Sequence, residues 1–541
     1  MGVMPLDVAI VVLLFGSCIA VGLYYKRTAE KDFDSFVMSK RGLPRSILMG
    51  TTFATTMSGS VLIAMPELVF REGIAFWIGY GSFMWIFTFG MVYVGRMLQV
   101  KLPPNVRTLP DLVVHYYGEP AGFLSVLLNY AYNLARTGTQ VLAIGTAFNT
   151  LFKIPLSTGL WIASLLLLAF VMLSGLWSVV INDYIQGVLM LIAVPLGVLY
   201  LWRSMGGFAP AVSSLPASYF SPMGKQVFTY WLAMQLGAGM KAWGQPEMYQ
   251  RLMIGKSSKT TIMSWAASAL IQAMFFGMVG VVGFYARLHF PALPSSQAVM
   301  KSWLSLPLVL RSLWVGGFLA ATLSTADSSL ILAATNVAND VYRRYINPKA
   351  QDSVLVTLTR LALPVSLGLT MLFAFSLKSV FDLHVWGLWL LLAGSLVLVP
   401  GTLLWPGKLN KWAGFPTMLF GLAAFLCGGP FFKMSTNNAY LLSLAVSAVI
   451  FLLFNLGGLS QRQSAGVAPG WSNLDVNPKT LTQLFLGVCG VSALYVFGGL
   501  FRWDWAFYAL PVGGLAAAVY LVWLRMVEHK EEVSHRGGNP L

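Results

Sequence analysis

A short run of hydroxyl side chains is the part of this chain best suited to bind an ion. Ser324 and Thr325 are adjacent, and Ser328 and Ser329 follow one helical turn later. Sodium is a hard cation that prefers oxygen ligands. The hydroxyls of Ser324 and Thr325 and the carbonyl of Ala321, one turn earlier, supply three oxygens. The alternative is that these hydroxyls bond back to carbonyls of their own helix.

Two predicted helices, 46–70 and 226–250, contain residues that interrupt a helix. These are Met57-Ser58-Gly59-Ser60 and Pro66 in the first segment, and Gly237, Gly239, Gly244 and Pro246 in the second. Freed backbone groups are tolerated in a membrane only where they face protein, water or a ligand. Unwound backbone near Ala54 and Met57 therefore offers two further carbonyls, which would complete a five-oxygen sodium cage. The alternative is that the glycines only allow close helix packing.

Four ionisable side chains lie within apolar segments, namely Arg136, Asp183, Lys241 and Asp327. Charges inside a membrane are costly, so each is a functional candidate. One alternative is that the two cations and two anions simply pair with each other. For Lys241, another is that it is neutral or extends to the membrane surface.

The composition requires most of the chain to lie in a membrane. Its 541 residues are 57% hydrophobic and only 10% charged, and the mean hydropathy is +0.72. Soluble domains carry about 25% charged residues, so a large soluble enzyme, a disordered chain and a fibrous protein are excluded. Apolar runs of about 20 residues indicate helices rather than barrel strands. We predict an all-α polytopic membrane protein with about 13–15 transmembrane helices.

Basic residues predict the orientation of the helices. The formal charge is +16, and the densest basic cluster is 26–45, directly after the first apolar run. The positive-inside rule places this cluster in the cytoplasm and the N-terminus outside. No basic stripe with interleaved aromatics is present, so nucleic acid is not an expected partner. Short loops and the absence of a disulfide framework favour the plasma membrane of a bacterium, the inner membrane.

The interrupted helices divide the chain into repeats. We expect a leading helix and basic loop over 1–45, additional helices over 406–526, and a cytoplasmic tail over 527–541 that is polar and disordered. Between them, 46–203 and 226–405 would each hold five helices. Because five is odd, the two blocks would have opposite orientations. Broken first helices in inverted repeats are typical of a transporter site at the membrane midplane.

At these residues the chain resembles the sodium/solute symporter family, which includes proline, pantothenate and sugar cotransporters. The matching patches, in order, are Phe36-Val37-Met38-Ser39-Lys40-Arg41-Gly42-Leu43-Pro44, Ala54-Thr55-Thr56-Met57-Ser58-Gly59, Trp243-Gly244-Gln245-Pro246 with Arg251, Leu323-Ser324-Thr325-Ala326-Asp327-Ser328, and Asn339-Asp340-Val341-Tyr342. The resemblance implies a LeuT-type fold with five-plus-five inverted repeats, and sodium-driven symport by alternating access.

The resemblance also implies site residues. The family's sodium site falls on the carbonyls of Ala54, Met57 and Ala321 and the hydroxyls of Ser324 and Thr325. In some relatives a second ion site uses an acidic residue that matches Asp183, near Ser328. The expected coupling ion is Na⁺.

The chain departs from the proline transporters of this family. Thr56 replaces an acidic residue, and Ala238 and Ala242 replace aromatic residues before the signature proline. Proline is therefore disfavoured, and the vacated space beside Lys241 would suit a larger or anionic solute, such as a carboxylate or an amino-acid-like compound. The candidate solute-binding residues are Tyr80, Gln140, Gln235, Lys241 and Trp243.

The leading hypothesis is sodium-coupled symport of a small organic solute, with the solute, sodium and the lipid bilayer as partners. The alternatives are a proton-coupled or uncoupled carrier, in which Asp183 or Asp327 titrates, and a transporter-like solute sensor. The sequence shows no nucleophile–base pair, metal-ligand cluster or phosphate-binding loop, so an enzyme is not expected. The sequence does not indicate the oligomeric state.

Overall fold

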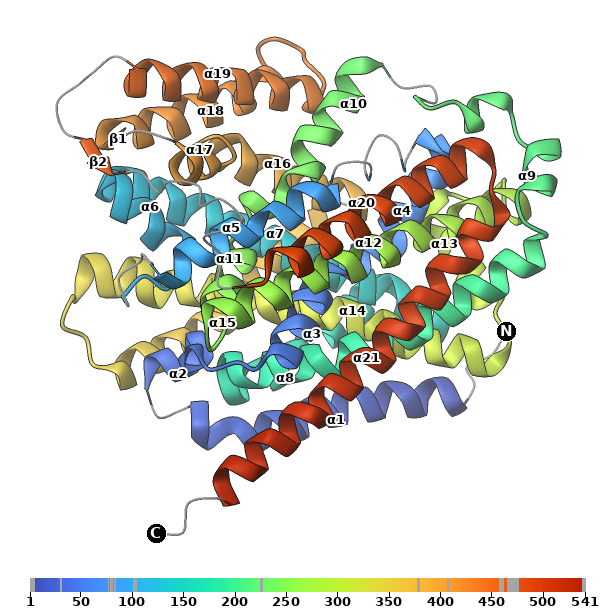
Figure 1. Ribbon diagram of the computed structural model, residues 1–541, viewed down its shortest axis with the longest axis horizontal. Helices are drawn as coiled ribbons and strands as arrows, with labels where there is room; N and C mark the ends of the chain where they lie inside the picture. Colours follow the sequence, from blue (N-terminus) through green and yellow to red (C-terminus); the bar gives the residue numbers. More distant parts are fainter. Residues whose placement is uncertain are drawn as a thin grey trace.

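The computed structural model describes residues 5–29, 32–75, 77, 81, 84–100, 105–223, 227–376, 380–405, 408–456, 462–464 and 476–537. Almost all of them lie in helices that form one bundle (Figure 1). In this view α18 and α19 lie at one edge of the bundle, α1 lies at the opposite edge, and α21 crosses the near face. This arrangement confirms an all-α protein.

The first part of the described chain forms nine α-helices and two 3₁₀ turns. The α-helices are α1 (Pro5–Ala29), α2 (Phe33–Met38), α3 (Arg45–Thr56), α4 (Gly59–Glu72), α5 (Met84–Val100), α6 (Leu109–Tyr117), α7 (Glu119–Phe152), α8 (Leu156–Met205) and α9 (Phe208–Ser214). A 3₁₀ turn, η1 (Ser39–Arg41), follows α2, another, η3 (Ala217–Phe220), follows α9, and a bridge joins Leu43 to Gly255.

The second part begins with a broken segment that consists of α10 (Phe228–Met234), a π-turn η4 (Gln235–Gly239), a 3₁₀ turn η5 (Lys241–Trp243) and α11 (Pro246–Met253). The following helices are α12 (Ser258–His289), α13 (Ser295–Leu304), α14 (Leu308–Thr335) with its π-helical extension η6 (Asn336–Ile346), α15 (Asp352–Ser376), α16 (Val380–Ser395) and α17 (Leu398–Leu404). This part therefore starts with an interrupted helix, which resembles the interrupted pair α3 and α4 in the first part.

The C-terminal part contains α18 (Gly414–Gly428), α19 (Thr436–Leu456), α20 (Pro478–Phe501) and α21 (Asp504–Gly537), with a 3₁₀ turn η7 (Lys411–Ala413) before α18. Two short antiparallel strands, β1 (Lys408–Asn410) and β2 (Arg462–Ser464), pair Leu409 with Gln463. Helix α21 continues beyond the apolar segment that ends near 526, so the expectation of a disordered tail is wrong up to Gly537. The last four residues lie outside the described part.

Nine helices in the described part are long and apolar enough to span a membrane, or ten when α3 and α4 count as one bent span. Shorter or interrupted helical elements outside this set are α5, the first section of α8, α10 with α11, and α18. Helix α7 is 34 residues long but carries buried polar side chains such as Asn129, Asn133 and Arg136.

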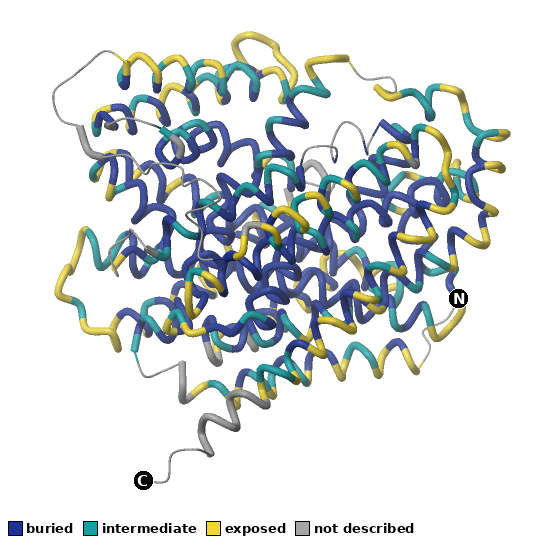
Figure 2. Tube along the Cα trace, in the orientation of Figure 1, coloured by how far each residue is buried: buried dark blue, intermediate teal, exposed yellow. Residues whose placement is uncertain are grey.

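Burial increases toward the centre of the bundle (Figure 2). Helix α12 shows this most clearly. In an apolar stretch of 18 residues, 89% of α12 is buried inside the protein, whereas 28% of the corresponding stretch of α1 is buried. The large side chains exposed on peripheral helices are apolar, for example Leu13, Val365, Leu372 and Leu453, which are 60–70% exposed. Such a surface is suited to contact with lipid chains.

Helix α8 is one continuous element of 50 residues that kinks at Gly175. This residue has φ 57°, a left-handed conformation that glycine adopts at low cost, and a Cβ there would come within 2.6 Å of the Phe36 carbonyl. The polar stretches 204–225 and 289–306 contain the short helices α9 and α13, which a search for long apolar runs does not detect.

Candidate functional site

The first break lies between α3 and α4, whose axes differ by 46°. Met57 leaves the helical conformation, with φ −88° and ψ 69°, and α4 begins two residues later. Gln140 on α7 accepts a hydrogen bond from the backbone N–H of Gly59 at 3.1 Å. A Cβ at Gly59 would lie 2.0 Å from the Thr322 methyl group, so glycine allows the break to approach α14.

Two hydroxyls on α14 contact the end of α3. Ser324 Oγ donates at 3.0 Å to the Ala54 carbonyl and lies 3.2 Å from the Ala321 carbonyl. Thr325 Oγ1 lies 3.2 Å from the Thr55 carbonyl and 3.3 Å from the Ala321 carbonyl. Each hydroxyl therefore bonds back to its own helix, as the alternative from the sequence expects, and also reaches a carbonyl of α3. The structure brings four of the five predicted ligand residues together.

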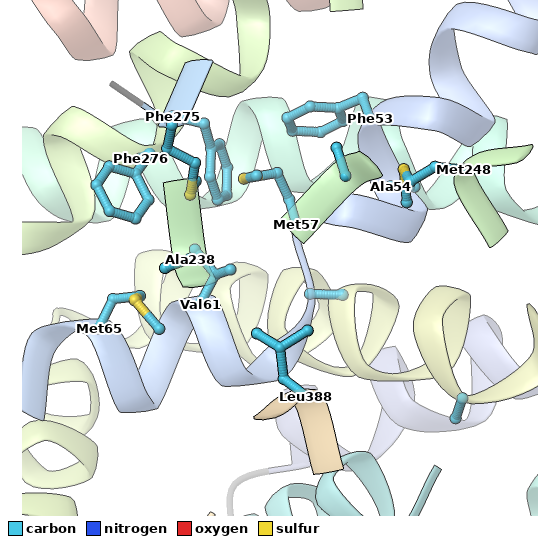
Figure 3. Close-up of a cluster of buried hydrophobic side chains, with 14 of the residues drawn as sticks. Phe53, Ala54, Met57, Val61, Met65, Ala238, Met248, Phe275, Phe276 and Leu388 are labelled. Carbon is cyan, nitrogen blue, oxygen red and sulfur yellow. The ribbon is translucent and has the colours of Figure 1, made fainter. Parts of the chain in front are cut away.

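Met57, the fifth predicted ligand residue, lies in the break itself. Its N–H donates to the Phe53 carbonyl at 2.9 Å. Within the described residues no hydrogen bond joins its carbonyl to Ser324 or Thr325. Figure 3 shows its side chain in an apolar group that includes Phe53 and Val61 from the same broken helix and Ala238 from η4. The two broken helices thus approach each other through apolar side chains.

A buried charge cluster, which we call the acidic cluster, lies beside these hydroxyls and consists of Asp183, Arg251 and Asp327. Arg251 Nη2 lies 3.1 Å from Asp183 Oδ2 and donates at 2.6 Å to Ser328 Oγ and at 3.0 Å to Thr55 Oγ1. The guanidinium therefore lies between Asp183 and Ser328, the pair suggested for a second ion. Arg251 lies in α11, and its charge compensates a carboxylate at 0% exposure.

Asp327 gives the acidic cluster an excess of negative charge. Its Oδ1 accepts from the backbone N–H of Ser328 at 2.5 Å, whereas its Oδ2 is buried and has no hydrogen-bond partner among the described residues. Asp327 interacts electrostatically with both Asp183 and Arg251. With Asp183 and Asp327 both ionised, two carboxylates and one guanidinium give this cluster a formal charge of −1.

The second break extends from η4 to the start of α11. The chain passes from the π-turn to a 3₁₀ turn before Pro246 opens α11. A Cβ at Gly237 would lie 2.2 Å from the Trp389 ring, so this turn packs tightly against α16. Trp243 Nε1 donates to the Phe87 carbonyl at 2.9 Å, which fixes the opposite side of the break to α5.

A second buried charge cluster, the basic cluster, consists of Arg136, Lys241 and Glu247. Arg136 Nε lies 3.3 Å from Glu247 Oε1, and the Tyr132 hydroxyl donates to the same oxygen at 3.0 Å. Gln245 Nε2 donates to the Tyr132 hydroxyl at 2.7 Å. Arg136 Nη2 also donates at 2.8 Å to the Thr55 carbonyl, and this bond connects the basic cluster to the first break.

Lys241 is only 5% exposed. It interacts electrostatically with Arg136 and Glu247, and it forms no hydrogen bond or ion pair with the residues that the structure describes. His384 on α16 lies within electrostatic range of the same two cations. With Lys241 and Arg136 charged, two cations and one carboxylate give the basic cluster a formal charge of +1.

The structure distributes the other predicted solute residues around the breaks. Gln140 holds the start of α4, Gln235 opens the π-turn, and Trp243 anchors η5 to α5. Tyr80 lies outside the described residues. The cations and anions of the four ionisable candidates do not pair among themselves, since Arg136 contacts Glu247 and Asp183 contacts Arg251. Glu247 and Arg251 were missed as site residues, although their positions directly after Pro246 place them one turn apart on α11.

A helical membrane bundle with two broken helices at one central site defines a secondary active transporter. The comparisons with known proteins agree with this class. The model of the sodium:solute symporter family matches residues 36–386, well over half of the chain, and the chain belongs to this family. The protein is thus a multi-pass transporter of the plasma membrane that couples solute movement to Na⁺, and it is not an enzyme.

Relatives and a solved structure support this assignment. The osmoregulated proline transporter OpuE of Bacillus subtilis is 23% identical over 76% of this chain and 87% of its own length. The sodium/proline symporter of Escherichia coli is 24% identical over 66% of this chain and 74% of its own length. The substrate-bound outward-open structure of a Na⁺-coupled sialic acid symporter has a TM-score of 0.71, with 14% identity, over 85% of this chain and 99% of that one. This structural likeness confirms the LeuT-type fold.

Proposed function

We propose that this transporter couples the inward movement of sodium to the uptake of a small organic anion, a carboxylate or an amino-acid-like compound. The observation that carries the proposal is the opposite excess charge of the two buried clusters. A buried charge without a partner is unfavourable. A cation near the acidic cluster and an anion near the basic cluster would balance both.

In this proposal sodium binds between α3 and α14. The carbonyls of Ala54 and Ala321 and the hydroxyls of Ser324 and Thr325 supply four oxygens, and the carbonyl of Met57 supplies the fifth from the break. The distances of 3.0–3.3 Å between hydroxyls and carbonyls support this role, because the oxygens already converge. Sodium would replace hydrogen bonds that now join the two helices.

A second sodium at Asp183 and Ser328 is not part of the proposal. Arg251 contacts both side chains with one nitrogen, and a metal ion there would meet strong repulsion from the guanidinium. We therefore propose one sodium ion per solute, with Arg251 as a permanent cation at the second position.

The solute would bind at the second break, where its carboxylate approaches Lys241. Proline and sialic acid, the solutes named for the relatives, both carry a carboxylate. Ala238 and Ala242 leave more space here than the aromatic residues of the proline transporters, which favours a solute other than proline. Gln235, Trp243, Gln140 and Tyr80 remain candidates to contact the rest of the solute.

Coupling would pass through Thr55. Its carbonyl accepts from Thr325 on the sodium side and from Arg136 on the solute side. A change in either bond alters the electrostatic environment of the other site. Coupling of this kind is reciprocal, so the solute must raise sodium affinity by the same factor by which sodium raises solute affinity.

One observation favours proton coupling as the alternative. Within the described part of the chain, the Oδ2 atom of Asp327 is buried and has no hydrogen-bond partner. A proton on this carboxyl group would neutralise the acidic cluster without sodium. Uptake would then follow an inward proton gradient in sodium-free solution. The Asp327→Asn variant would abolish that dependence.

The surrounding architecture also enters the proposal. We propose that 46–203 and 226–405 are the two inverted repeats, that 1–45 and 406–526 flank them, and that the lipid bilayer contacts the apolar helices at the periphery. The C-terminal segment from 527 would lie on the cytoplasmic side.

The test is uptake into proteoliposomes of a panel of radiolabelled carboxylates, neutral amino acids and cationic amines, with an inward gradient of sodium, potassium or choline. We expect sodium-dependent uptake of at least one carboxylate. Lys241→Met should raise the KM for it roughly 30-fold, equivalent to about 2 kcal/mol. Lys259→Met, which removes an exposed lysine, is the control. Uptake of only neutral or cationic solutes would contradict the proposal.

A further inference from the structure

A cavity of about 910 Å³ lies at the ends of α4, α7 and α13, away from both charge clusters. Its walls contain apolar residues such as Ile63 and Leu304 and hydroxyl groups such as Thr150 and Ser296. Six charged residues line it, namely Asp7, Glu67, Arg71, Lys153, Lys301 and Arg311. This cavity has no role in the site described above.

The two carboxylates of this cavity are already matched by arginines. Arg311 Nη2 contacts Asp7 Oδ2 at 2.6 Å, and Arg71 Nη2 lies 3.7 Å from Glu67 Oε2. These pairs use all the negative charge of the lining. They leave the cavity with a formal charge of +2, carried by two lysines.

Lys153 and Lys301 have no carboxylate partner among the described residues. Lys153 ends α7 in the left-handed conformation, with φ 59°, and is exposed. Lys301 is exposed on α13, and its Nζ lies 4.8 Å from the centre of the Phe290 ring. An aromatic face orients an ammonium group but does not neutralise it. Both ammonium groups are therefore available to an anion.

The predicted orientation places this cavity on the outer face, with the N-terminal end of α1. Basic residues are normally concentrated on the cytoplasmic side of membrane proteins. Four basic residues around one outer cavity run against this bias. A cavity lined by one sign of charge concentrates ions of the opposite sign.

Two helices that line the cavity, α4 and α16, also reach the breaks. Ile63 in its lining lies four residues beyond Gly59 on α4, about 6 Å along the helix. Val380 in its lining lies one turn before His384, which interacts electrostatically with Lys241. Helices α4 and α16 thus connect the lining of the cavity to the two breaks.

We propose that this cavity is an outer vestibule that binds small organic anions, in which Lys153 and Lys301 receive the carboxylate before it passes to Lys241. The inference rests on the proposed function for the identity of the solute. The positive potential itself depends only on the residues of the cavity, and it can be measured without solute or sodium.

The test measures the reactivity of a cysteine in the vestibule toward reagents of opposite charge. Ser296→Cys is made in the full chain with Cys427 and Cys489 replaced by alanine, while the buried Cys18 is kept. The rates of modification by negatively charged 2-sulfonatoethyl and positively charged 2-(trimethylammonium)ethyl methanethiosulfonate are compared. Ser214→Cys on α9, exposed outside the cavity, is the reference position.

We expect the anion-to-cation rate ratio to be higher at Ser296→Cys than at Ser214→Cys. It should fall about fivefold in the Lys153→Gln/Lys301→Gln background at low ionic strength, and less at high ionic strength. The Lys153→Arg/Lys301→Arg pair should keep the ratio. Lys433→Gln, which removes an exposed lysine that is also left-handed and lies outside the cavity, should leave it unchanged.

Equal ratios at the two positions, or a ratio that does not respond to the glutamine pair, would overturn the vestibule. Sodium-dependent carboxylate uptake could still be present in that case, and the proposed function would stand. If the anion-to-cation rate ratio behaves as expected but no carboxylate is taken up, the proposed function is contradicted and the positive vestibule is still supported.

Discussion

Both breaks are interruptions of a helix, but the charged side chains around them differ in the sign of their net charge. At the first break, hydroxyls and carbonyls converge beside the acidic cluster, whose formal charge is −1. At the second, the basic cluster has a formal charge of +1 and includes a lysine without a partner in the described part of the chain. A broken helix exposes backbone groups of both signs. The side chains around each break therefore decide which ion it suits.

The two clusters are also held differently. Arg251 bonds to three side chains at the first break, so its position is fixed. Lys241 at the second break is buried and forms no hydrogen bond with the residues that the structure describes. In our proposal the first cluster is a rigid frame for a small ion, and the second leaves one charge for the solute.

The largest expected effect comes from Arg251→Met, which removes the frame of the acidic cluster. It leaves Asp183 and Asp327 buried together, and breaking a buried pair costs about 3–5 kcal/mol. Thermal unfolding in detergent should show a large fall in Tm. The Arg251→Met/Asp183→Asn double variant removes the stranded charge and should recover much of the loss. A Tm equal to wild type for Arg251→Met would mean that the cluster is not charged as described.

Gly237→Ala tests the packing of the second break. The added Cβ would lie 2.2 Å from the Trp389 ring, and overpacking of this kind costs about 1–3 kcal/mol. We expect a lower Tm and weaker solute binding with unchanged sodium affinity. Gly239→Ala is the matched control, because its Cβ would lie 3.6 Å from Phe87, an ordinary contact. Equal effects of the two variants would show that the turn is loosely packed.

Arg136→Gln tests the link between the breaks. Coupling energies between sites are about 1–3 kcal/mol, or 5- to 150-fold in affinity. Solute affinity is measured with and without sodium. In Arg136→Gln the factor by which sodium raises solute affinity should be mostly lost, because the bond to the Thr55 carbonyl is altered. Arg203→Gln, at the exposed end of α8, serves as the control. If Arg136→Gln keeps the full sodium effect on solute affinity, the coupling takes another route.

Glu528→Gln is expected to have the smallest effect, and only on the first broken helix. Glu528 on α21 accepts hydrogen bonds from the backbone N–H groups of Arg45 at 3.0 Å and Ser46 at 3.1 Å. A carboxylate at a helix N-terminus contributes about 1 kcal/mol. The Tm of Glu528→Gln should fall by a few degrees, and the Tm of Glu528→Asp should fall by less. A Tm unchanged by Glu528→Gln would show that α21 does not support α3.

Much of the fold could be predicted from long apolar runs and from the Gly and Pro residues in two of them. The helical periodicity and the interruptions at Met57 and Gly237 are local properties, so they can be read without partners. The kink at Gly175 and the extension of α21 could not, because packing against Phe36 and capping of α3 are long-range contacts.

The site was predictable to the same extent. Ser324 and Thr325 were found because they are adjacent hydroxyls in an apolar helix, and the structure places them against α3. The partners of the charged residues were not found. Arg251 and Glu247 lie in a short helix rich in polar residues, which resembles a loop in hydropathy, and their burial follows only from the positions of Asp183 and Arg136 on other helices.

The most direct measurement of the central claim is the thermal stability of the purified protein against increasing NaCl, with matched KCl and choline chloride. Wild type, Ser324→Ala and Thr335→Ala are compared, the last because its hydroxyl bonds only within its own helix. A ligand that binds the folded state raises stability with its concentration. We expect a sodium-specific rise in Tm in wild type and Thr335→Ala that is lost in Ser324→Ala. Equal stability in all three salts, or an undiminished sodium effect in Ser324→Ala, would contradict a sodium site at the first break.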